Sequence, residues 1–150
     1  MIQIKKGLLS DKLKDEISKR YFESIKQMGD SQFSYVERRI EKKLRLLKSP
    51  SSDFLEMSIA TLAEPMWVVL QEEKDRTLFE WPSDAKKLIA ALYYLCTPDD
   101  IIPDFDKIRG YADDAYVINE FFRDIESTLM MNKIIHQINL LHEEYEEDDL

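Results

Sequence analysis

Apolar residues recur at every third or fourth position along most of this chain, which is the spacing of one face of an α-helix. The first periodic stretch begins at Ser10, a good N-cap residue, and ends before Gly29, a residue type that often terminates helices. The second opens on Ser34 and Glu37, which have the Ser-x-x-Glu spacing of a capping box, and the third begins at Asp53. The pattern predicts helices over residues 10–28, 34–48, 53–70, 83–95 and 111–141.

Interruptions of this pattern predict where helices start, bend or stop. Ser83 is suited to cap the fourth stretch. Pro65 lies inside the third stretch and removes a backbone hydrogen bond there, so we expect a break at residues 63–65. We expect a second break near Asn132, within the last stretch. Residues 142–150 include six acidic residues, and we expect this acidic tail to fray into solvent.

The composition favours the same architecture. The 150 residues include three glycines and few alternating runs of β-branched residues, which argues against a β-sheet. A chain of this length can bury a single hydrophobic core without disulfides or a structural metal. We therefore predict an all-α, single-domain helical bundle of about five to seven helices.

The cysteine and the apolar runs indicate the cellular compartment. Cys96 is the single cysteine, so the chain cannot form an internal disulfide and a reducing compartment is indicated. The longest uninterrupted apolar run, residues 88–96, is much shorter than the roughly 18 residues of a membrane span. The N-terminal residues lack the apolar region of a signal peptide. We expect a cytoplasmic protein, with Cys96 as a buried, inert thiol.

The net charge of −9 is unevenly distributed. Residues 1–48 carry thirteen Lys and Arg against seven Asp and Glu, whereas residues 49–150 carry eight against twenty-three. We expect a basic N-terminal helical pair over residues 1–48, an acidic helical core over residues 53–141 and the acidic tail, all within one domain. The sequence leaves three explanations open: the two parts dock on each other, the acidity serves solubility, or the acidic part faces a basic partner and the basic part an anionic one.

Residues 96–114, CTPDDIIPDFDKIRGYADD, concentrate six aspartates directly after the most apolar segment. The cluster has three interpretations: a metal site, a catalytic carboxylate cluster, or a turn between two helices. Thr97–Asp100 has the hydroxyl, proline and acids typical of a helix start. We favour a turn whose aspartates accept main-chain N–H groups. A metal site would instead need convergence of Asp100, Asp104, Asp113 and Asp114, whose spacing is not that of an EF-hand.

The segment from Thr97 to Asp114 resembles the YkvA-like family, a domain of unknown function (DUF1232), and the resemblance extends over roughly residues 86–118. The matching motif positions are Pro98, Asp100, Pro103, Asp104, Gly110, Asp113 and Asp114. The resemblance implies a helical hairpin with its turn at residues 97–114 and no agreed activity, and we expect the motif to lock the turn rather than to perform a reaction. Where the family has apolar residues or proline, this chain has polar or charged ones, so insertion of the hairpin into a membrane is not expected. These positions are Asp99, Asp106, Lys107 and Arg109.

The predicted helix 34–48 carries a row of cations opposite its apolar stripe. They are Arg38, Arg39, Lys42, Lys43 and Arg45. Such a helix can lie on an anionic membrane or bind nucleic acid, or it can be a solvated face whose cations pair with neighbours, such as Glu41 with Arg45. We favour the solvated face. We expect no nucleic-acid binding, because the excess negative charge repels phosphates.

These patterns predict a non-enzymatic helical interaction module that binds a basic protein partner through its acidic surface, without a cofactor or a metal. One alternative is a metal-dependent enzyme that uses the aspartate cluster, but the sequence offers no evident nucleophile, base histidine or phosphate-binding glycine loop. His136 and His142 are on different faces of a predicted helix and do not suit a shared metal. The other alternative is peripheral membrane contact through the basic helix 34–48.

Overall fold

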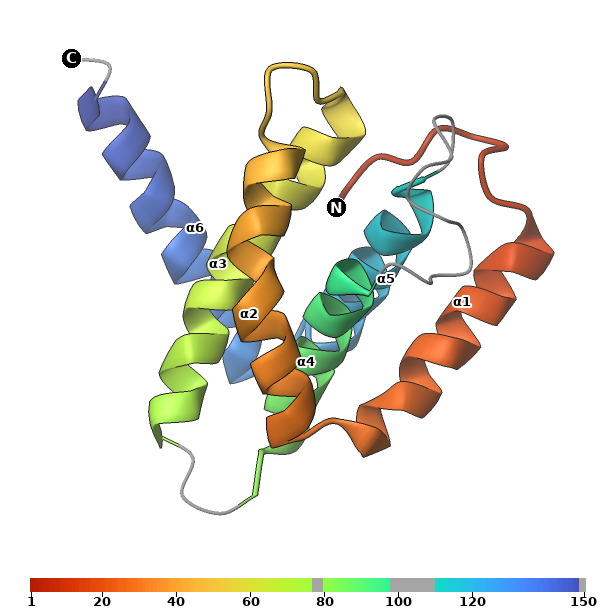
Figure 1. The fold of residues 1–150 in the computed structure, drawn as a ribbon, viewed down its shortest axis with the longest axis horizontal. Helices are drawn as coiled ribbons and strands as arrows, with labels where there is room; N and C mark the ends of the chain where they lie inside the picture. Colours follow the sequence, from red (N-terminus) through yellow and green to blue (C-terminus); the bar gives the residue numbers. More distant parts are fainter. Residues whose placement is uncertain (77–79, 98–109, 149–150) are drawn as a thin grey trace.

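The computed structural model describes residues 1–76, 80–97 and 110–148, with side chains as far as Glu143. This part of the chain forms helices and contains no β-strand (Figure 1). The elements are α1 (Asp11–Ser24), the 3-10 turn η1 (Ile25–Gln27), α2 (Asp30–Leu47), α3 (Phe54–Arg76), α4 (Ser83–Cys96), α5 (Ala112–Asp124) and α6 (Leu129–Asp148). The predicted all-α, single-domain bundle is confirmed. Among the described helices, none combines the length and the apolarity needed to cross a bilayer.

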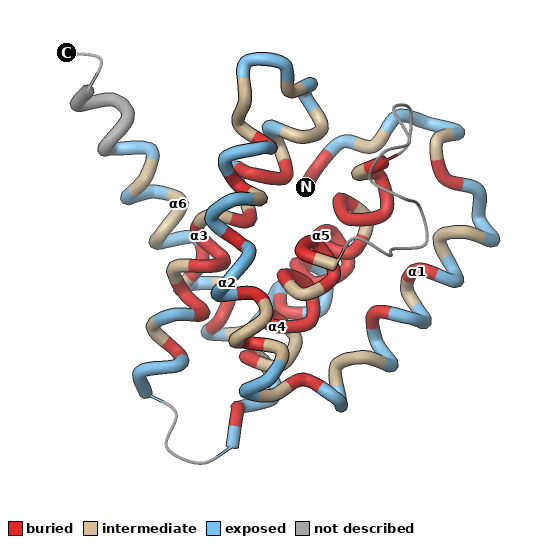
Figure 2. The backbone as a smooth tube through the Cα atoms, viewed as in Figure 1, coloured by how far each residue is buried: buried red, intermediate tan, exposed pale blue. Residues whose placement is uncertain are grey.

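Helix α4 lies at the centre of the bundle. Helices α1, α2, α3 and α5 all pack against it. Nine of its fourteen residues are buried, which agrees with the nearly continuous apolar sequence of residues 88–96. Figure 2 shows buried positions concentrated along α4 and α5, whereas α1 and α2 alternate between buried and exposed positions. The core therefore forms around the α4–α5 hairpin, and the other helices cover it.

The two N-terminal helices pack on this hairpin separately. Helix α1 packs on α5 and α4, whereas α2 packs on α4 and α3. In Figure 1, α1 and α2 stand apart and are joined at one end through η1. The basic residues 1–48 therefore cover two different sides of the hairpin.

Helix α2 begins at Asp30, so the predicted start at Ser34 is wrong. Its N-cap is Gly29, whose N–H donates to Oε1 of Gln32 at 3.0 Å. The additional turn is held by Phe33, which is buried against two tryptophan rings from distant parts of the chain. This long-range aromatic contact determines the start of the helix, and the local spacing of Ser34 does not reveal it.

Helix α3 is continuous through Pro65, so the predicted break at residues 63–65 is wrong. Its start is as predicted, because Oδ1 of Asp53 accepts the Glu56 N–H at 2.8 Å and Oε1 of Glu56 accepts the Asp53 N–H at 3.4 Å. A proline inside a helix removes one backbone hydrogen bond. Here Pro65 is buried with core residues on both sides of it, and their packing holds the two halves in one helix.

The last predicted helix is two helices, because the chain turns at residues 125–128 rather than near Asn132. The Thr128 N–H donates to the carbonyl of Ile125 at 2.9 Å, and the Thr128 hydroxyl donates to the same carbonyl at 2.8 Å. A threonine that bonds to the nearby backbone in this way competes with helix propagation. The apolar periodicity continues on both sides of the turn and therefore hides it.

Most other boundaries agree with the sequence to within a residue, but α3 continues to Arg76, past its predicted end at residue 70, and α6 continues past residue 141. The Ser10 hydroxyl caps α1 by accepting a first-turn N–H at 3.2 Å, as predicted. Ser83 is the first residue of α4, and the N-cap is Pro82 without a side-chain hydrogen bond, so the predicted cap at Ser83 is wrong. Helix α6 continues to Asp148, so most of the acidic tail is helical rather than frayed. The high helix propensity of glutamate favours this extension.

The N-terminal segment is anchored by one buried side chain of α5. The Asn119 carboxamide accepts the Ile2 N–H and donates to the Ile2 carbonyl, both at 2.9 Å. Ile2 is itself buried, and Leu9 is buried further along the same segment. A carboxamide that pairs with both polar groups of one residue acts like a short piece of β-ladder. The segment is thus part of the bundle.

Candidate functional site

The α4–α5 hairpin is antiparallel and is held at both ends by side-chain contacts. Near the turn, the Tyr94 hydroxyl donates to Oδ2 of Asp113 at 2.9 Å, and both residues are buried. At the far end, Nζ of Lys87 lies 2.9 Å from Oδ2 of Asp124. The hydrogen bond to Asp124 raises the pKa of Lys87 above its usual value, against the opposing effect of burial. The two contacts fix the register of the hairpin.

Two of the six clustered aspartates, Asp113 and Asp114, lie in the described residues. Both are in the first turn of α5, near the positive end of the helix dipole, and their exposed fractions are 0% and 1%. One partner of Asp113 is a side-chain hydroxyl rather than a main-chain amide. The buried Gly110 lies shortly before α5. The other motif residues, Pro98, Asp100, Pro103 and Asp104, lie outside the described residues, so their role in locking the turn stays a prediction.

The candidate metal ligands do not gather in the described part of the chain. Within it, no three His, Cys, Asp or Glu side chains are arranged to hold a metal ion. His136 and His142 are exposed on α6, and Cys96 is buried at the end of α4. A metal-dependent reaction would need aspartates such as Asp100 and Asp104, which lie outside this part. The enzyme alternative therefore stays a prediction that rests on the sequence.

The antiparallel hairpin is the part of the chain that corresponds to a known family. Residues 86–119 match the family model DUF1232. That family is described as a protein of unknown function, and the match confirms the resemblance inferred from the motif. It begins in α4 and ends in α5. No curated protein and no solved structure gives a match. We call the pair α4–α5 the DUF1232 hairpin, because it contains the matched residues, and the description of that family gives no activity.

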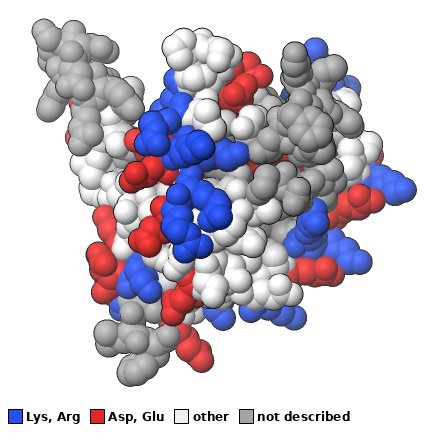
Figure 3. Space-filling model, viewed as in Figure 1, with Lys and Arg blue, Asp and Glu red and all other residues white. Residues whose placement is uncertain are grey.

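Helix α2 packs on the DUF1232 hairpin and turns a cationic face to solvent. Its apolar stripe is buried and consists of Phe33, Val36, Ile40, Leu44 and Leu47. On the other side Lys43 is half-buried, and four cations are exposed. These four are Arg38, Arg39, Lys42 and Arg45, and we call them the α2 basic face. Figure 3 shows a cluster of basic side chains gathered over α2.

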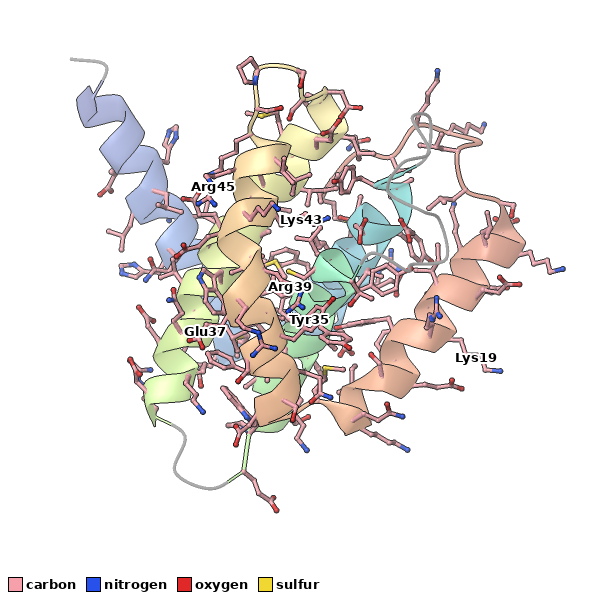
Figure 4. The ribbon with its side chains drawn as sticks, in the orientation of Figure 1. Lys19, Tyr35, Glu37, Arg39, Lys43 and Arg45 are labelled. Atoms are coloured by element: carbon pink, nitrogen blue, oxygen red, sulfur yellow. The ribbon has the colours of Figure 1, made fainter. Side chains whose placement is uncertain are left out.

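Aromatic rings support part of this surface. The Arg39 guanidinium lies 3.6 Å from the centroid of the Tyr35 ring, and its Nη1 donates to the Tyr35 carbonyl at 3.3 Å (Figure 4). The Tyr35 ring packs on Tyr93 of the DUF1232 hairpin, with centroids 5.0 Å apart. Nζ of Lys43 lies 5.3 Å from the centroid of the Tyr111 ring. Sequence reasoning missed the role of Tyr35, although a tyrosine four residues before an arginine signals such a contact on a helix.

Among the described residues, no acid forms an ion pair with the α2 basic face. The predicted pair of Glu41 with Arg45 does not form, and none of the four cations has a carboxylate within 4.0 Å among the described residues. At the end of α2, Lys48 does pair with Glu64. A solvated pair four residues apart on a helix gains only about 0.2–0.5 kcal/mol, so hydration of the separate groups competes with it. A positive surface results on a chain of net charge −9.

Proposed function

We propose that the chain is a non-enzymatic interaction module whose α2 basic face docks on an anionic membrane surface. The observation that supports this proposal is the exposure of four cations on one helix face, without ion-pair partners among the described residues. Such a face creates a local attraction for phosphate and carboxylate groups that opposes the overall negative charge of the protein.

The shape of the α2 basic face suits a plane better than a compact ligand. Arg38 and Arg45 are separated by about 10 Å along the helix axis, and the face is the convex outer side of a helix packed on the bundle. A compact anion needs polar groups that converge in a concave pocket. Leu46 follows Arg45 and has an exposed fraction of 54%, so it offers an apolar side chain to the headgroup region.

The expected affinity is modest and depends on salt. Each Lys or Arg near an anionic bilayer contributes about 1 kcal/mol, so the four cations supply about 4 kcal/mol before opposing terms. Glu37 and Glu41 are exposed on the same helix and reduce this attraction. Acids farther away are screened, because the Debye length is about 8 Å at physiological ionic strength. Binding should therefore be reversible and should weaken as salt is added.

Co-sedimentation with vesicles tests the proposal. The chain should bind vesicles that contain phosphatidylserine at low salt, and it should not bind vesicles of phosphatidylcholine alone. The double variant Arg38→Gln/Lys42→Gln should lower the partition coefficient about 30-fold, which corresponds to two contributions of about 1 kcal/mol. The control Lys12→Gln/Lys19→Gln removes the same charge from exposed positions of α1, where Lys19 points away from α2 (Figure 4), and should bind like the parent chain.

Two results contradict this function. If the chain does not bind anionic vesicles at low salt, the α2 basic face does not serve membrane contact. If the α1 control loses as much binding as the α2 variant, total charge rather than the α2 basic face determines the affinity.

A further inference from the structure

Helix α6 is attached to α3 through side chains of its first half. Ile134 is buried in the bundle, and Nζ of Lys133 donates to Oε1 of Glu73 at 2.6 Å. One turn later, Nε2 of Gln137 donates to Oε1 of Glu72 at 3.2 Å. Past these contacts, the C-terminal end of α6 points away from the other helices (Figure 1). The second half of α6 and the first half of α3 therefore form the two walls of an open groove.

This groove has a volume of about 510 Å³, and most of its lining surface is apolar. Met57 and Ala60 line it from α3, and Ile138 and Leu141 line it from α6. Met57 is 42% exposed, and both α6 residues are only half-buried. On each wall the two apolar residues are three positions apart, so each pair lies on one face of its helix. An apolar strip bounded by two helices results, and apolar surface of this kind often marks a binding site.

Polar residues border the groove, and the chain continues from its α6 wall into an acidic stretch of sequence. Lys48 and Glu64 form an ion pair at the edge near α3. His142 lies on the α6 edge, and the sequence places five acids in the remaining helical residues, 143–148. Because α6 stays helical to Asp148, these acids are carried by the same helix that forms one wall of the groove.

We infer that this groove binds an amphipathic helix of a protein partner, with apolar side chains between α3 and α6 and Lys or Arg side chains beside the acidic end of α6. A helix that docks in a groove presents apolar anchors three or four positions apart, which matches the spacing on both walls. Charge complementarity selects a basic flank, because a neutral or acidic flank would gain nothing from the acids of residues 143–148. This inference uses a different surface from the proposed membrane contact and does not depend on it.

A second copy of the chain does not supply the helix that the groove requires. The basic amphipathic helix of the chain is α2, and its apolar stripe is buried inside the bundle. Helix α6 has exposed apolar residues, but it would bring a second set of acids against the first. The partner is therefore a different protein.

Fluorescence anisotropy of a labelled synthetic peptide tests the inference on the full chain. The probe is a peptide of about four helical turns with leucine at every third or fourth position and lysine and arginine on the flanks, and the control peptide has the same composition in scrambled order. The amphipathic peptide should bind saturably. Met57→Gln should weaken its binding about tenfold. Leu129→Gln, at a position that is 68% exposed at the other end of α6, is the matched control and should not change binding.

Each contrary result overturns the inference. Equal affinity for the scrambled peptide would mean that charge alone attracts the probe. An equal loss in the Met57→Gln and Leu129→Gln variants would mean that the groove is not the binding site. Self-association of the peptide-free chain in sedimentation velocity, abolished by Met57→Gln, would make a second copy the occupant. None of these results changes the vesicle measurement on the α2 variants, so the two proposals fail separately.

Discussion

Replacing Asn119 with alanine removes the side chain of α5 that forms two hydrogen bonds with the N-terminal segment. Its two hydrogen bonds to Ile2, both 2.9 Å long, contribute about 1 kcal/mol each to the free energy of unfolding. Ile2 is 5% exposed, and releasing a buried isoleucine costs about 2 kcal/mol more. Release of Ile2 also returns about 1–2 kcal/mol of backbone entropy. This entropy offsets most of the lost burial of Ile2, so the net loss should be about 2 kcal/mol.

Thermal unfolding followed by far-UV circular dichroism measures this loss. Asn119→Ala should lower Tm by about 4–8 °C, because 1 kcal/mol corresponds to about 2–4 °C for a chain of this size. Deletion of residues 1–4 provides the second arm of a double-mutant cycle. In the shortened chain Asn119→Ala should cost less than about 0.5 kcal/mol, because its partner is already absent. An equal loss of stability in both backgrounds would refute the anchoring role of Asn119.

Three further predictions concern buried or partly buried polar groups. Burial raises the pKa of Tyr21 above its ordinary value of about 10. Above pH 10 the folded chain therefore keeps a proton that the unfolded chain loses. The free energy of unfolding should then fall by about 1.4 kcal/mol per pH unit. In urea unfolding, Tyr21→Phe should flatten this alkaline loss; an unchanged slope would contradict the assignment. Asp124→Asn should lower the free energy of unfolding at pH 7 by less than about 1 kcal/mol. This difference from the parent chain should vanish as the pH rises above 10.5 through the raised pKa of Lys87, because Lys87 then loses its charge. The same difference at pH 7 and at pH 11 would contradict the ion pair. Tyr94→Phe removes one donor to the buried Asp113 carboxyl and should cost about 1–3 kcal/mol, measured as a lower urea midpoint; an unchanged midpoint would mean that this contact does not hold the hairpin.

Helix boundaries were predictable where the contacts that set them are local. The caps at Ser10 and at Asp53 join residues three positions apart, so the residue types alone predict them. The start of α2 depends instead on the packing of Phe33 against Trp81, with ring centroids 5.3 Å apart, and these residues are distant in sequence. The bond between Ile2 and Asn119 spans 117 positions and leaves no periodic signal. Such contacts exist only in the folded chain.

The candidate surfaces were predictable to different degrees for the same reason. The cations of α2 lie at helical spacing, so the sequence indicates one basic face. Whether Arg45 pairs with Glu41 depends on a balance of a few tenths of a kcal/mol, which residue spacing cannot decide. The groove at Met57 and Leu141 depends on the angle between α3 and α6. That angle follows from contacts on the first half of α6, so the apolar pattern of α6 alone does not reveal an open groove.

The position of the DUF1232 hairpin within the bundle decides which properties of this chain the family match can inform. In the described part of the matched segment, α4 is surrounded by α1, α2, α3 and α5, and most residues of α5 are buried. A buried residue cannot contact a partner without local unfolding, and opening core elements costs up to the full free energy of unfolding. The α2 basic face and the groove between α3 and α6 both lie outside the match. The family match therefore informs only about the core hairpin. The binding properties of this chain have to be measured on surfaces that its other helices supply.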